Sequence, residues 1–296
     1  MRTLLIGSGG QLGHDLRRVW SGELIALSHQ EIDVSDREQV LAVIGKEKPD
    51  LVINAAAYHR VDEIEEELAR AFAVNAIGAK HVADAARQID AAVLWISTDY
   101  VFDGEKGSAY VESDLPCPLN AYGASKLAGE QLVRQSNPRH FVVRSSSLFG
   151  LAGASGKGGN FVETMLRKAR AGDELRVVDD QVASPTCTLD LARKLQELAQ
   201  TERYGLYHVT NSGQTSWYGF AAKIFELAGL EPSLTPISSN ELSAPARRPR
   251  CSVLANRALE GAGVAPARSW EEALADYLQE KGHLPAAKAT TPSGTA

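Results

Sequence analysis

The sequence predicts an α/β protein built on a doubly wound parallel sheet, followed by a smaller C-terminal part. Two observations predict this fold. Short apolar runs alternate with helical patterns through the first 150 residues, and parallel strands need such crossover helices, which cover both faces of the sheet. A glycine-rich turn also stands between the first apolar run and the first helical pattern. The 296 residues are 44% hydrophobic and 23% charged, enough for one large or two modest domains.

The elements follow in order along the chain. Strands are predicted at residues 3–6, 24–27, 51–54, 93–97 and 141–144. Helices are predicted at residues 11–20, 36–44, 64–88 and 119–135, with Ser35 or Asp36 as the cap of the second and a break near Gly78 in the third. Further on, the patterns favour a mobile loop at 152–160, helices at 161–171 and 189–199, and a strand at 175–178.

The glycine turn has the spacing G-x-x-G-x-x-G. Glycines at these positions permit a tight turn and let the backbone approach a pyrophosphate closely, while the N–H groups and dipole of the following helix attract that anion. Because the turn follows a strand and opens a helix, we interpret it as a dinucleotide site. The expected contacts come from Gly7, Gly10, Gln11, Leu12 and Gly13.

The end of the second strand bears on which dinucleotide is bound. In NAD enzymes a carboxylate there pairs with the ribose 2′-hydroxyl. Here residues 28–30 read Ser-His-Gln, and no carboxylate appears before Glu31. This favours NADPH, with Arg17 or Arg18 as partners for its 2′-phosphate, and leaves NADH open.

Two further segments are candidate cofactor contacts. Asp33 and Val34 would fall near the adenine. Ala55, Ala56 and Ala57 follow the third strand with side chains small enough for close passage of a dinucleotide. Simple packing of a strand against a helix is the alternative explanation for the alanines.

The domain organisation follows from these patterns. Residues 1–150 are predicted to form the dinucleotide-binding domain, to which a segment of about 175–210 returns. Residues 151–280 are predicted to be the substrate-binding part. The tail at 281–296 has almost no large apolar residues, so we expect it to be disordered.

Composition excludes several classes of protein. A net charge of -6 argues against nucleic-acid binding, which needs basic patches. Three cysteines far apart in the sequence suit reduced thiols, and no stretch is apolar enough for a membrane span. We therefore expect a soluble cytoplasmic protein. The acidic run at 62–67 is typical of a helix start, and no metal ligand set is predicted.

Three polar residues are candidates for catalysis. Tyr122 and Lys126 are four residues apart, so a helix would place them on one face. A neighbouring ammonium favours the phenolate, so Lys126 is expected to lower the pKa of Tyr122 toward neutrality and fit it for proton transfer. Thr98 follows the fourth strand, at the sheet edge where ligands of such folds bind.

Thr98, Tyr122 and Lys126 together resemble the Ser/Thr–Tyr-x-x-x-Lys site of the extended short-chain dehydrogenase/reductase superfamily, which has a Rossmann-type fold. The resemblance is closer to one of its families, dTDP-4-dehydrorhamnose reductase. The segments that carry this resemblance are 10–13 (GQLG), 97–104 (STDYVFDG), 122–130 (YGASKLAGE), 180–186, 213–221 (GQTSWYGFA) and 248–254.

The resemblance implies hydride transfer from NADPH or NADH to the C4 ketone of a dTDP-linked 6-deoxy-4-ketosugar. Tyr122 would protonate the carbonyl oxygen, Lys126 would hold the nicotinamide ribose, and Asn75 would support the site through a water relay. The substrate contacts implied are Thr98, Asp99, Ser147, Asn160 and Arg248, with the Arg248 guanidinium suited to the diphosphate. Whether the chain forms a homodimer is left open.

One departure and two alternatives bear on function. Many members of the family carry tryptophan where this chain has Ser147, so the sugar pocket is expected to be wider or more polar. A 4,6-dehydratase is disfavoured because Tyr100, and not glutamate, follows Asp99. An epimerase or reductase for another nucleotide-linked ketosugar and a non-catalytic NADP-binding regulatory subunit remain as alternatives.

Overall fold

The computed structural model describes residues 1–153 and 159–284. Within them, a central six-stranded sheet has the order β10-β5-β4-β3-β1-β2, and every neighbouring pair is parallel. Its strands are β1 (Arg2–Ile6), β2 (Glu23–Leu27), β3 (Leu51–Asn54), β4 (Ala92–Thr98), β5 (His140–Ser145) and β10 (Gly205–His208). The inner strands are buried along almost their whole length, as a sheet covered on both faces requires.

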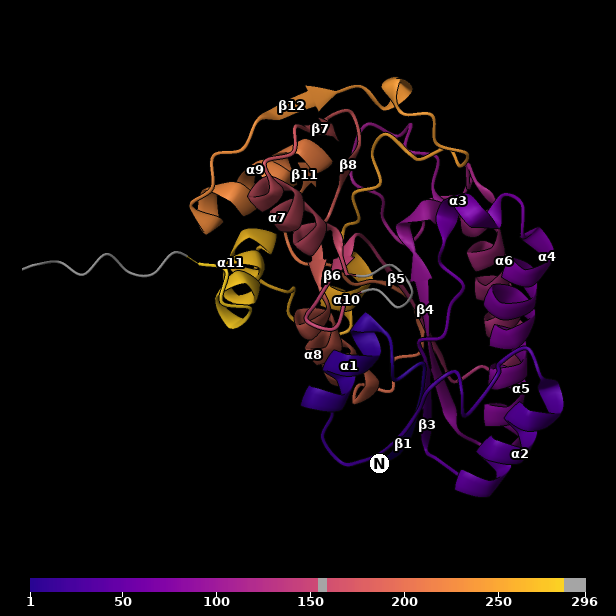
Figure 1. The fold of residues 1–296 in the computed structure, drawn as a ribbon. Coiled ribbons are helices and arrows are strands. Elements are labelled where there is room, and N and C mark those ends of the chain that lie inside the picture. The colour runs from indigo at the N-terminus through magenta and orange to yellow at the C-terminus, as the bar shows by residue number, and fades with distance from the viewer. Residues whose placement is uncertain (154–158, 285–296) are drawn as a thin grey trace, which may run out of the picture.

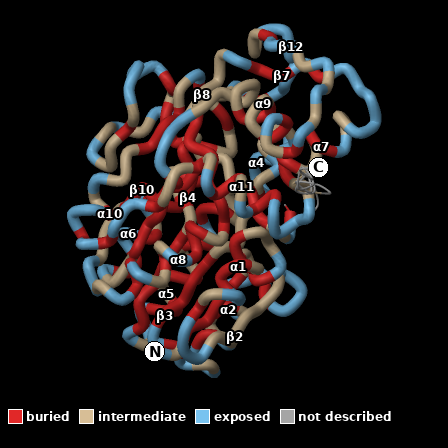
Figure 2. The backbone as a smooth tube through the Cα atoms, turned by 90° about the vertical axis from the view of Figure 1, so that its left-hand side faces the viewer, coloured by how far each residue is buried: buried red, intermediate tan, exposed pale blue. Residues whose placement is uncertain are grey.

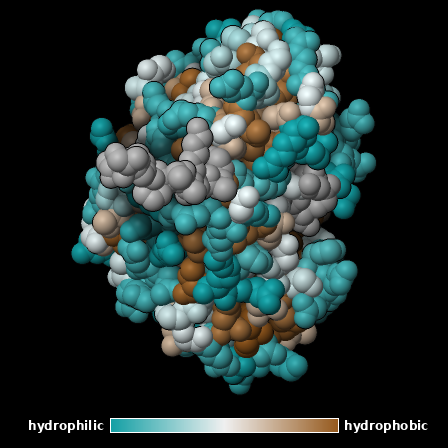
Figure 3. All heavy atoms as spheres, turned by 60° about the vertical axis from the view of Figure 1, so that its left-hand side comes forward, coloured by the Kyte–Doolittle hydropathy of each residue, from teal (hydrophilic) through white to brown (hydrophobic). Residues whose placement is uncertain are grey.

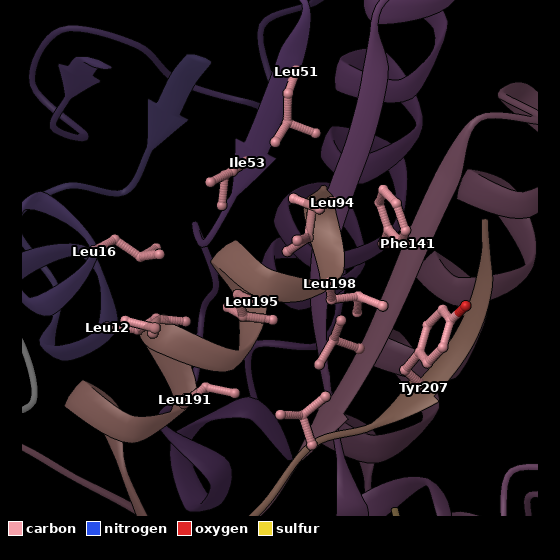
Figure 4. Packing of buried hydrophobic residues seen from close by; sticks show 14 of the residues in the cluster. Leu12, Leu16, Leu51, Ile53, Leu94, Phe141, Leu191, Leu195, Leu198 and Tyr207 are labelled. Carbon is pink, nitrogen blue, oxygen red and sulfur yellow. The ribbon is translucent and has the colours of Figure 1, made fainter. Parts of the chain in front are cut away.

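Helices cover both faces of this sheet (Figure 1). One face carries α1 (Gln11–Val19) and α8 (Thr188–Ala199), and the other carries α2 (Arg37–Glu47), α5 (Ala79–Gln88) and α6 (Ala121–Ser136). In Figure 4 the leucines of α1 and α8 lie against apolar side chains of the strands; those labelled are Leu12, Leu16, Leu51, Ile53, Leu94, Phe141, Leu191, Leu195, Leu198 and Tyr207. The predicted doubly wound α/β fold is therefore confirmed, and Asp36 caps α2 as expected.

The crossover between β3 and β4 differs from the single helix predicted at 64–88. It consists of α3 (Val61–Ile64), α4 (Leu68–Phe72), the π-helix η1 (Ala73–Gly78) and α5. Gly78 is the last residue of the π-helix, and it packs closely on Val34, since a Cβ there would lie 2.7 Å from Cγ2 of Val34. Single π-turns are rare and often occur at functional sites, and propensity patterns cannot distinguish them from α-helix.

The C-terminal part has its own apolar core of residues from α7 (Phe161–Ala171), α9 (Trp217–Ala228) and α11 (Trp270–Glu280). Its short strands pair two by two: β6 (Leu148–Phe149) with β9 (Thr186–Cys187), β7 (Leu175–Val178) with β12 (Leu234–Ile237), and β8 (Val182–Ala183) with β11 (Thr215–Ser216). The remaining elements are η2 (Asp99–Val101), η3 (Ser239–Glu241) and α10 (Arg257–Gly261).

Burial follows this two-part arrangement. In Figure 2 the buried residues run along the strands and the inner sides of the flanking helices. The face drawn in Figure 3 is mainly hydrophilic, with hydrophobic residues in smaller patches. None of the helices in the described ranges is long and apolar enough to cross a bilayer. The loop predicted at 152–160 and the tail predicted from 281 fall largely outside the described residues, so their mobility stays a prediction.

Candidate active site

The glycine turn joins the ends of three strands. Gly7 has a φ of 90°, and its N–H donates to the Leu27 carbonyl at 2.9 Å. A Cβ on Gly7 would lie 2.9 Å from the carbonyl carbon of Ala55, and one on Gly13 would lie 2.2 Å from the Gly7 oxygen. Only glycine fits at these two positions, so the turn brings the N-terminus of α1 to the carboxyl edge of the sheet.

The N-terminus of α1 is open toward an anion. Gly10 is the N-cap residue, and no described side chain caps the helix. The Gln11 side chain donates to the Leu148 carbonyl at 3.5 Å, while its Oε1 is buried without a hydrogen-bond partner among the described residues. Leu12 is buried in the core beneath the helix. Uncapped N–H groups and a positive dipole end fit the pyrophosphate of a dinucleotide.

The end of β2 holds a carboxylate that its sequence did not indicate. Both the N–H and the hydroxyl of Ser28 donate to Glu31 Oε2 at 2.8 Å, and these hydrogen bonds lower the pKa of Glu31. The Glu31 carboxylate therefore lies at the end of β2, where the sequence indicated no carboxylate. Arg18, a predicted 2′-phosphate partner, is instead paired with Asp15 at 3.0 Å and Glu280 at 2.7 Å.

The remaining predicted cofactor contacts lie along the same edge. The Asp33 carboxylate accepts from the N–H and hydroxyl of Ser35, so it stabilises the local turn. Val34 is buried against Gly78. Residues 55–57 are half-buried after β3, where the Ala56 N–H donates to Asn54 Oδ1 at 3.1 Å.

Helix α6 approaches the end of β4 because it carries two glycines on its inner side. Asn120 caps the helix by accepting from the Gly123 N–H at 2.8 Å. A Cβ on Gly123 would lie 2.1 Å from the Tyr100 carbonyl oxygen, and one on Gly129 would lie 2.3 Å from the Asn75 carbonyl oxygen. This close packing fixes how near α6 lies to the end of β4, and therefore where the catalytic candidates on the helix stand relative to that strand end.

The three catalytic candidates meet around the end of β4. Thr98 is the last residue of β4, and its hydroxyl lies close enough to the Tyr122 phenol to act on the pKa of that phenol. Lys126 is buried; its Nζ donates to the Ile96 carbonyl at 2.5 Å and lies 3.9 Å from the centroid of the Trp95 ring. The structure thus places Tyr122 beside Thr98, while the Lys126 ammonium is directed at the backbone and indole ring of β4.

The electrostatics of this trio differ from the expectation. Burial lowers the pKa of Lys126 to about 7, although the Glu130 carboxylate opposes this shift. Burial and the charge of Asp99 raise the pKa of Tyr122 above its ordinary value. The expected lowering of the Tyr122 pKa is therefore wrong for this arrangement, in which the ammonium faces a carbonyl and an indole ring.

A buried ion pair lies one helical turn beyond Lys126. The Glu130 carboxylate accepts two hydrogen bonds from Arg144, at 2.8 and 2.7 Å, and one from the Ser97 hydroxyl at 2.6 Å. The side chains of Glu130 and Arg144 are 0% and 2% exposed. The pair ties α6 to β4 and β5 at the level of the catalytic candidates.

Asp99 is enclosed by hydroxyl groups. It is 3% exposed and accepts from Ser252 at 2.5 Å, Ser146 at 2.8 Å and Thr98 at 3.0 Å. Burial raises the pKa of Asp99, and these three hydroxyls oppose the rise. Ser146 and Ser252 were not singled out from the sequence, although Ser252 falls in the segment 248–254 that carries the family resemblance.

Arg248 lies over the other side of Tyr100. Its guanidinium pairs with Asp62 at 2.7 Å and donates to the Ala246 carbonyl at 2.7 Å, and its charge acts to lower the raised pKa of Tyr100. The neighbouring Arg247 carbonyl accepts from Asn120 Nδ2 at 2.7 Å. The segment 246–252 therefore crosses from the C-terminal part to α3 and the start of α6.

Ser147 borders a small pocket next to this segment. Its φ of 47° lies in the left-handed region, which turns the chain sharply after β5. The pocket opens to solvent and is lined by Tyr100, Ser147, Gln181, Val182, Ala183, Trp217, Pro249 and Ser252. Gln181 and Trp217 were not identified as site residues from the sequence, though Trp217 is part of the GQTSWYGFA segment.

Two predicted site residues have structural partners instead. Asn160 caps α7 through the Glu163 N–H at 3.0 Å, and its Nδ2 donates to the Gly150 carbonyl and to Tyr277. Asn75 is fully buried in the π-helix, and its side chain bonds both backbone groups of Tyr58. We find no acidic, histidine or cysteine cluster arranged to hold a metal in the described ranges.

Comparison with known proteins decides the family. A family model described as "RmlD substrate binding domain" matches residues 1–282. The chain is 39% identical over 290 residues to "dTDP-4-dehydrorhamnose reductase" of Aggregatibacter actinomycetemcomitans, covering 92% of this chain and 97% of that protein. The chain belongs to the dTDP-4-dehydrorhamnose reductase family.

Other relatives include a protein of spore coat polysaccharide biosynthesis and two reductases of known structure. "Spore coat polysaccharide biosynthesis protein SpsK" of Bacillus subtilis (strain 168) is 42% identical over 283 residues, covering 95% of this chain and 98% of that protein. The crystal structure of a dTDP-4-dehydrorhamnose reductase from Clostridium acetobutylicum superposes with a TM-score of 0.91 at 40% identity, covering 95% of this chain and 100% of that one. The enzyme from Bacillus anthracis, solved in complex with NADP, gives a TM-score of 0.90 at 39% identity over 94% and 99%.

Proposed function

We propose that this protein reduces the C4 ketone of dTDP-4-dehydro-6-deoxy-L-mannose to dTDP-L-rhamnose, using NADPH and also accepting NADH. The observation that carries the proposal is that the Tyr122 phenol lies beside Thr98 at the sheet edge where the glycine turn opens α1, with Lys126 one turn further along α6. Membership of a family whose named members are nucleotide-sugar reductases supports it.

Each part of the site has a task in this reaction. A reduced nicotinamide, when bound, supplies the hydride. The open N–H groups of α1 hold the pyrophosphate, with Gly10 leaving room for close approach. Tyr122 donates its proton to the ketone oxygen as that atom becomes an alkoxide, and the Thr98 hydroxyl positions the phenol. Lys126 is the proposed partner of the nicotinamide ribose.

The pocket beside Tyr100 is the proposed site of the sugar. Trp217 and Tyr100 offer aromatic walls to the apolar faces of a hexose, and Ser147 and Gln181 offer polar groups to its hydroxyls. Arg248 lies at the same mouth, where its guanidinium suits a diphosphate. To bind a phosphate it must exchange at least part of its pairing with Asp62.

The test is an assay of the purified protein with dTDP-4-dehydro-6-deoxy-L-mannose and either NADPH or NADH, following the absorbance of the reduced nicotinamide. Turnover with product identified as dTDP-L-rhamnose supports the proposal. The panel also contains dTDP- and UDP-linked 4-ketosugars of other configurations, with Tyr122→Phe as the inactive control.

A different ketosugar is the second candidate, and Ser147 favours it. A small hydroxyl there, where many family members carry tryptophan, leaves more room beside Tyr100 and Trp217. Faster turnover of another sugar in the panel identifies that substrate. Tight NADPH binding with no turnover of any sugar instead favours a non-catalytic cofactor-binding role.

A further inference from the structure

Asn120 stands where the helix that carries Tyr122 meets the segment 246–252. We propose that Asn120 is a positioning residue: its amide holds that segment on the N-terminus of α6 and so keeps one wall of the sugar pocket in a fixed place relative to the Tyr122 phenol. Asn120 acts through these neighbours and not by touching the substrate. The inference rests on the proposed function, because it gives the residue a part in binding the ketosugar.

The two ends of the Asn120 amide bind different parts of the chain. Its Oδ1 accepts from the Gly123 N–H at 2.8 Å and caps α6. Its Nδ2 donates to the Arg247 carbonyl at 2.7 Å, across 127 residues of sequence. Asn120 is only 6% exposed, so water does not easily replace a lost partner of its side chain. An acceptor and a donor on one short side chain are what an amide offers.

Asp62 holds the same stretch of the segment from α3. Its carboxylate accepts from the Ala246 N–H at 3.2 Å and from the Arg248 guanidinium at 2.7 Å. The Asp62 and Arg248 side chains are 46% and 23% exposed, and partly exposed ion pairs of this kind are screened by water. Because Asn120 is buried, we assign it the larger share in holding the segment.

The far end of the segment belongs to the C-terminal part of the chain. The Val182 N–H donates to the Arg250 carbonyl at 2.7 Å, and the Ser252 N–H donates to the Val182 carbonyl at 2.9 Å. Pro249 and Ser252 line the pocket beside Tyr100. One end of the segment is therefore joined to β8 and the other to the start of α6, so the Asn120 contact decides where this pocket wall lies relative to α6.

The start of α6 is itself fixed against the opposite wall of the pocket. A Cβ on Gly123 would lie 2.1 Å from the Tyr100 carbonyl oxygen, and the rings of Tyr100 and Tyr122 meet edge to face with centroids 6.1 Å apart. A segment bonded to the start of this helix is thus held at a set distance from the phenol. A sugar bound against both walls then presents its ketone to the proton donor in a constant geometry.

Two variants separate the helix cap from the contact with the segment. Asn120→Asp keeps an acceptor for the Gly123 N–H, and aspartate caps helices as well as asparagine does, but it has no donor for the Arg247 carbonyl. Asn120→Ser also keeps a good cap without adding charge. Its hydroxyl oxygen takes the place of Cγ, one bond short of the donor that it replaces.

In both variants we expect KM for the ketosugar to rise about tenfold, because the Arg247 carbonyl has lost its donor and the pocket wall is no longer fixed. We expect kcat and the NADPH affinity, measured by fluorescence titration, to stay close to the wild-type values, because α6 and the glycine turn are intact. Asn240→Asp makes the same chemical change on an exposed residue of η3 and should leave KM unchanged.

A second measurement needs neither turnover nor a ligand. Hydrogen exchange followed by mass spectrometry compares peptides that cover residues 241–249 and 121–127. The Ala246 N–H, which bonds to Asp62, should exchange about tenfold faster in both Asn120 variants, while the α6 peptide keeps its wild-type protection. If no ketosugar is turned over, the proposed function fails, and the exchange rates still decide whether Asn120 holds the segment.

The inference is supported by faster exchange at 241–249 together with a raised KM and a preserved kcat. It is overturned if that peptide exchanges at the wild-type rate in both variants, or if KM is unchanged. A loss of kcat larger than the rise in KM, or faster exchange confined to the α6 peptide, would make Asn120 a helix cap alone and overturns it as well.

Discussion

The Lys126 ammonium lies 3.9 Å from the centroid of the Trp95 ring. The indole face and the Ile96 carbonyl are its two polar partners, and both are neutral. Such contacts recover only part of the hydration that a buried ammonium loses. The pKa of Lys126 accordingly falls to about 7, so the residue exchanges charge within the physiological pH range.

We expect the stability of the protein to reflect this pKa. The ordinary value of 10.5 in the unfolded chain exceeds the folded value of about 7, so the unfolded state binds more protons between them and stability rises with pH over that window. Lys126→Met, which is always neutral, lacks this contribution. The free energy of unfolding of Lys126→Met should exceed that of the wild type by the largest margin below pH 7. This margin should shrink by ~1.4 kcal/mol for each unit of pH above 7.

Urea unfolding of both proteins from pH 6 to 9.5 measures this difference. Lys46→Met is the matched control because the Lys46 side chain is 82% exposed; its difference from the wild type should not vary with pH. A constant gap for Lys126→Met would show that Lys126 titrates near its ordinary pKa.

Tyr122→Phe should lower kcat by about 10³-fold, within the range that general acid catalysis supplies. The phenol oxygen beside Thr98 is lost, but the ring keeps its edge contact with Tyr100, with the ring centroids 6.1 Å apart. Cofactor affinity, measured by fluorescence titration with NADPH, should change less than threefold. Turnover near the wild-type rate would remove Tyr122 from the role of acid.

Gly10→Ala tests the placement of the dinucleotide. A Cβ on Gly10 meets only the Gly7 oxygen, at an ordinary 3.5 Å, so the folded protein should keep its melting temperature. The added methyl group would stand between the turn and a pyrophosphate, and NADPH affinity should fall by roughly tenfold or more. Gly45→Ala in α2, where a Cβ meets nothing within 4 Å, should leave binding unchanged. Equal affinities for both variants would place the cofactor elsewhere.

Glu31→Gln should change the preference between the two nicotinamide cofactors. The carboxylate held by Ser28 suits a ribose 2′-hydroxyl and repels a 2′-phosphate. Its neutralisation should raise kcat/KM for NADPH relative to NADH. Glu38→Gln, an 85% exposed side chain at the start of α2, serves as the control for a change of net charge. If the ratio of kcat/KM with NADPH to kcat/KM with NADH is the same in the wild type, Glu31→Gln and Glu38→Gln, then Glu31 does not contact the cofactor.

Removing one partner of the Glu130–Arg144 pair should lower the free energy of unfolding more than replacing both partners with apolar residues. Glu130→Gln leaves a buried guanidinium without its counter-ion, so we expect a loss of about 3–5 kcal/mol in unfolding free energy. The double change Glu130→Met with Arg144→Met should lose less than either single change. Arg37→Met, which breaks an exposed pair with Glu38, should cost under about 1 kcal/mol. Additive losses at the buried pair would argue against strong coupling.

The fold was accessible from the sequence because its signals are local. Alternating apolar and helical segments define the sheet, and the i, i+4 spacing of Tyr122 and Lys126 follows from helix geometry alone. The turn glycines are equally local, since Gly7 and Gly13 contact one another.

The rest of the site depends on contacts between distant segments. Ser252 reaches Asp99 across 153 residues, and Arg248 reaches Asp62 across 186; a single sequence holds no signal for either pair. The direction of the Lys126 side chain depends on how closely α6 approaches Trp95. The pKa of Tyr122 is raised by burial and by Asp99, so the direction of its shift was predicted wrongly. From the sequence, Glu31 was expected to lie beyond the end of β2. In the structure a three-residue turn folds its carboxylate back onto Ser28.

Through the segment 246–252, both parts of the chain contribute residues to the candidate active site. It supplies the hydroxyl of Ser252 to Asp99 and rests on Asp62 and Asn120 of the first part. A chimaera that exchanges C-terminal halves between relatives would thus change the residue that contacts Asp99 as well as the proposed sugar pocket. Engineers seeking to graft specificity should transplant Asp62, Asn120 and this strip as one block.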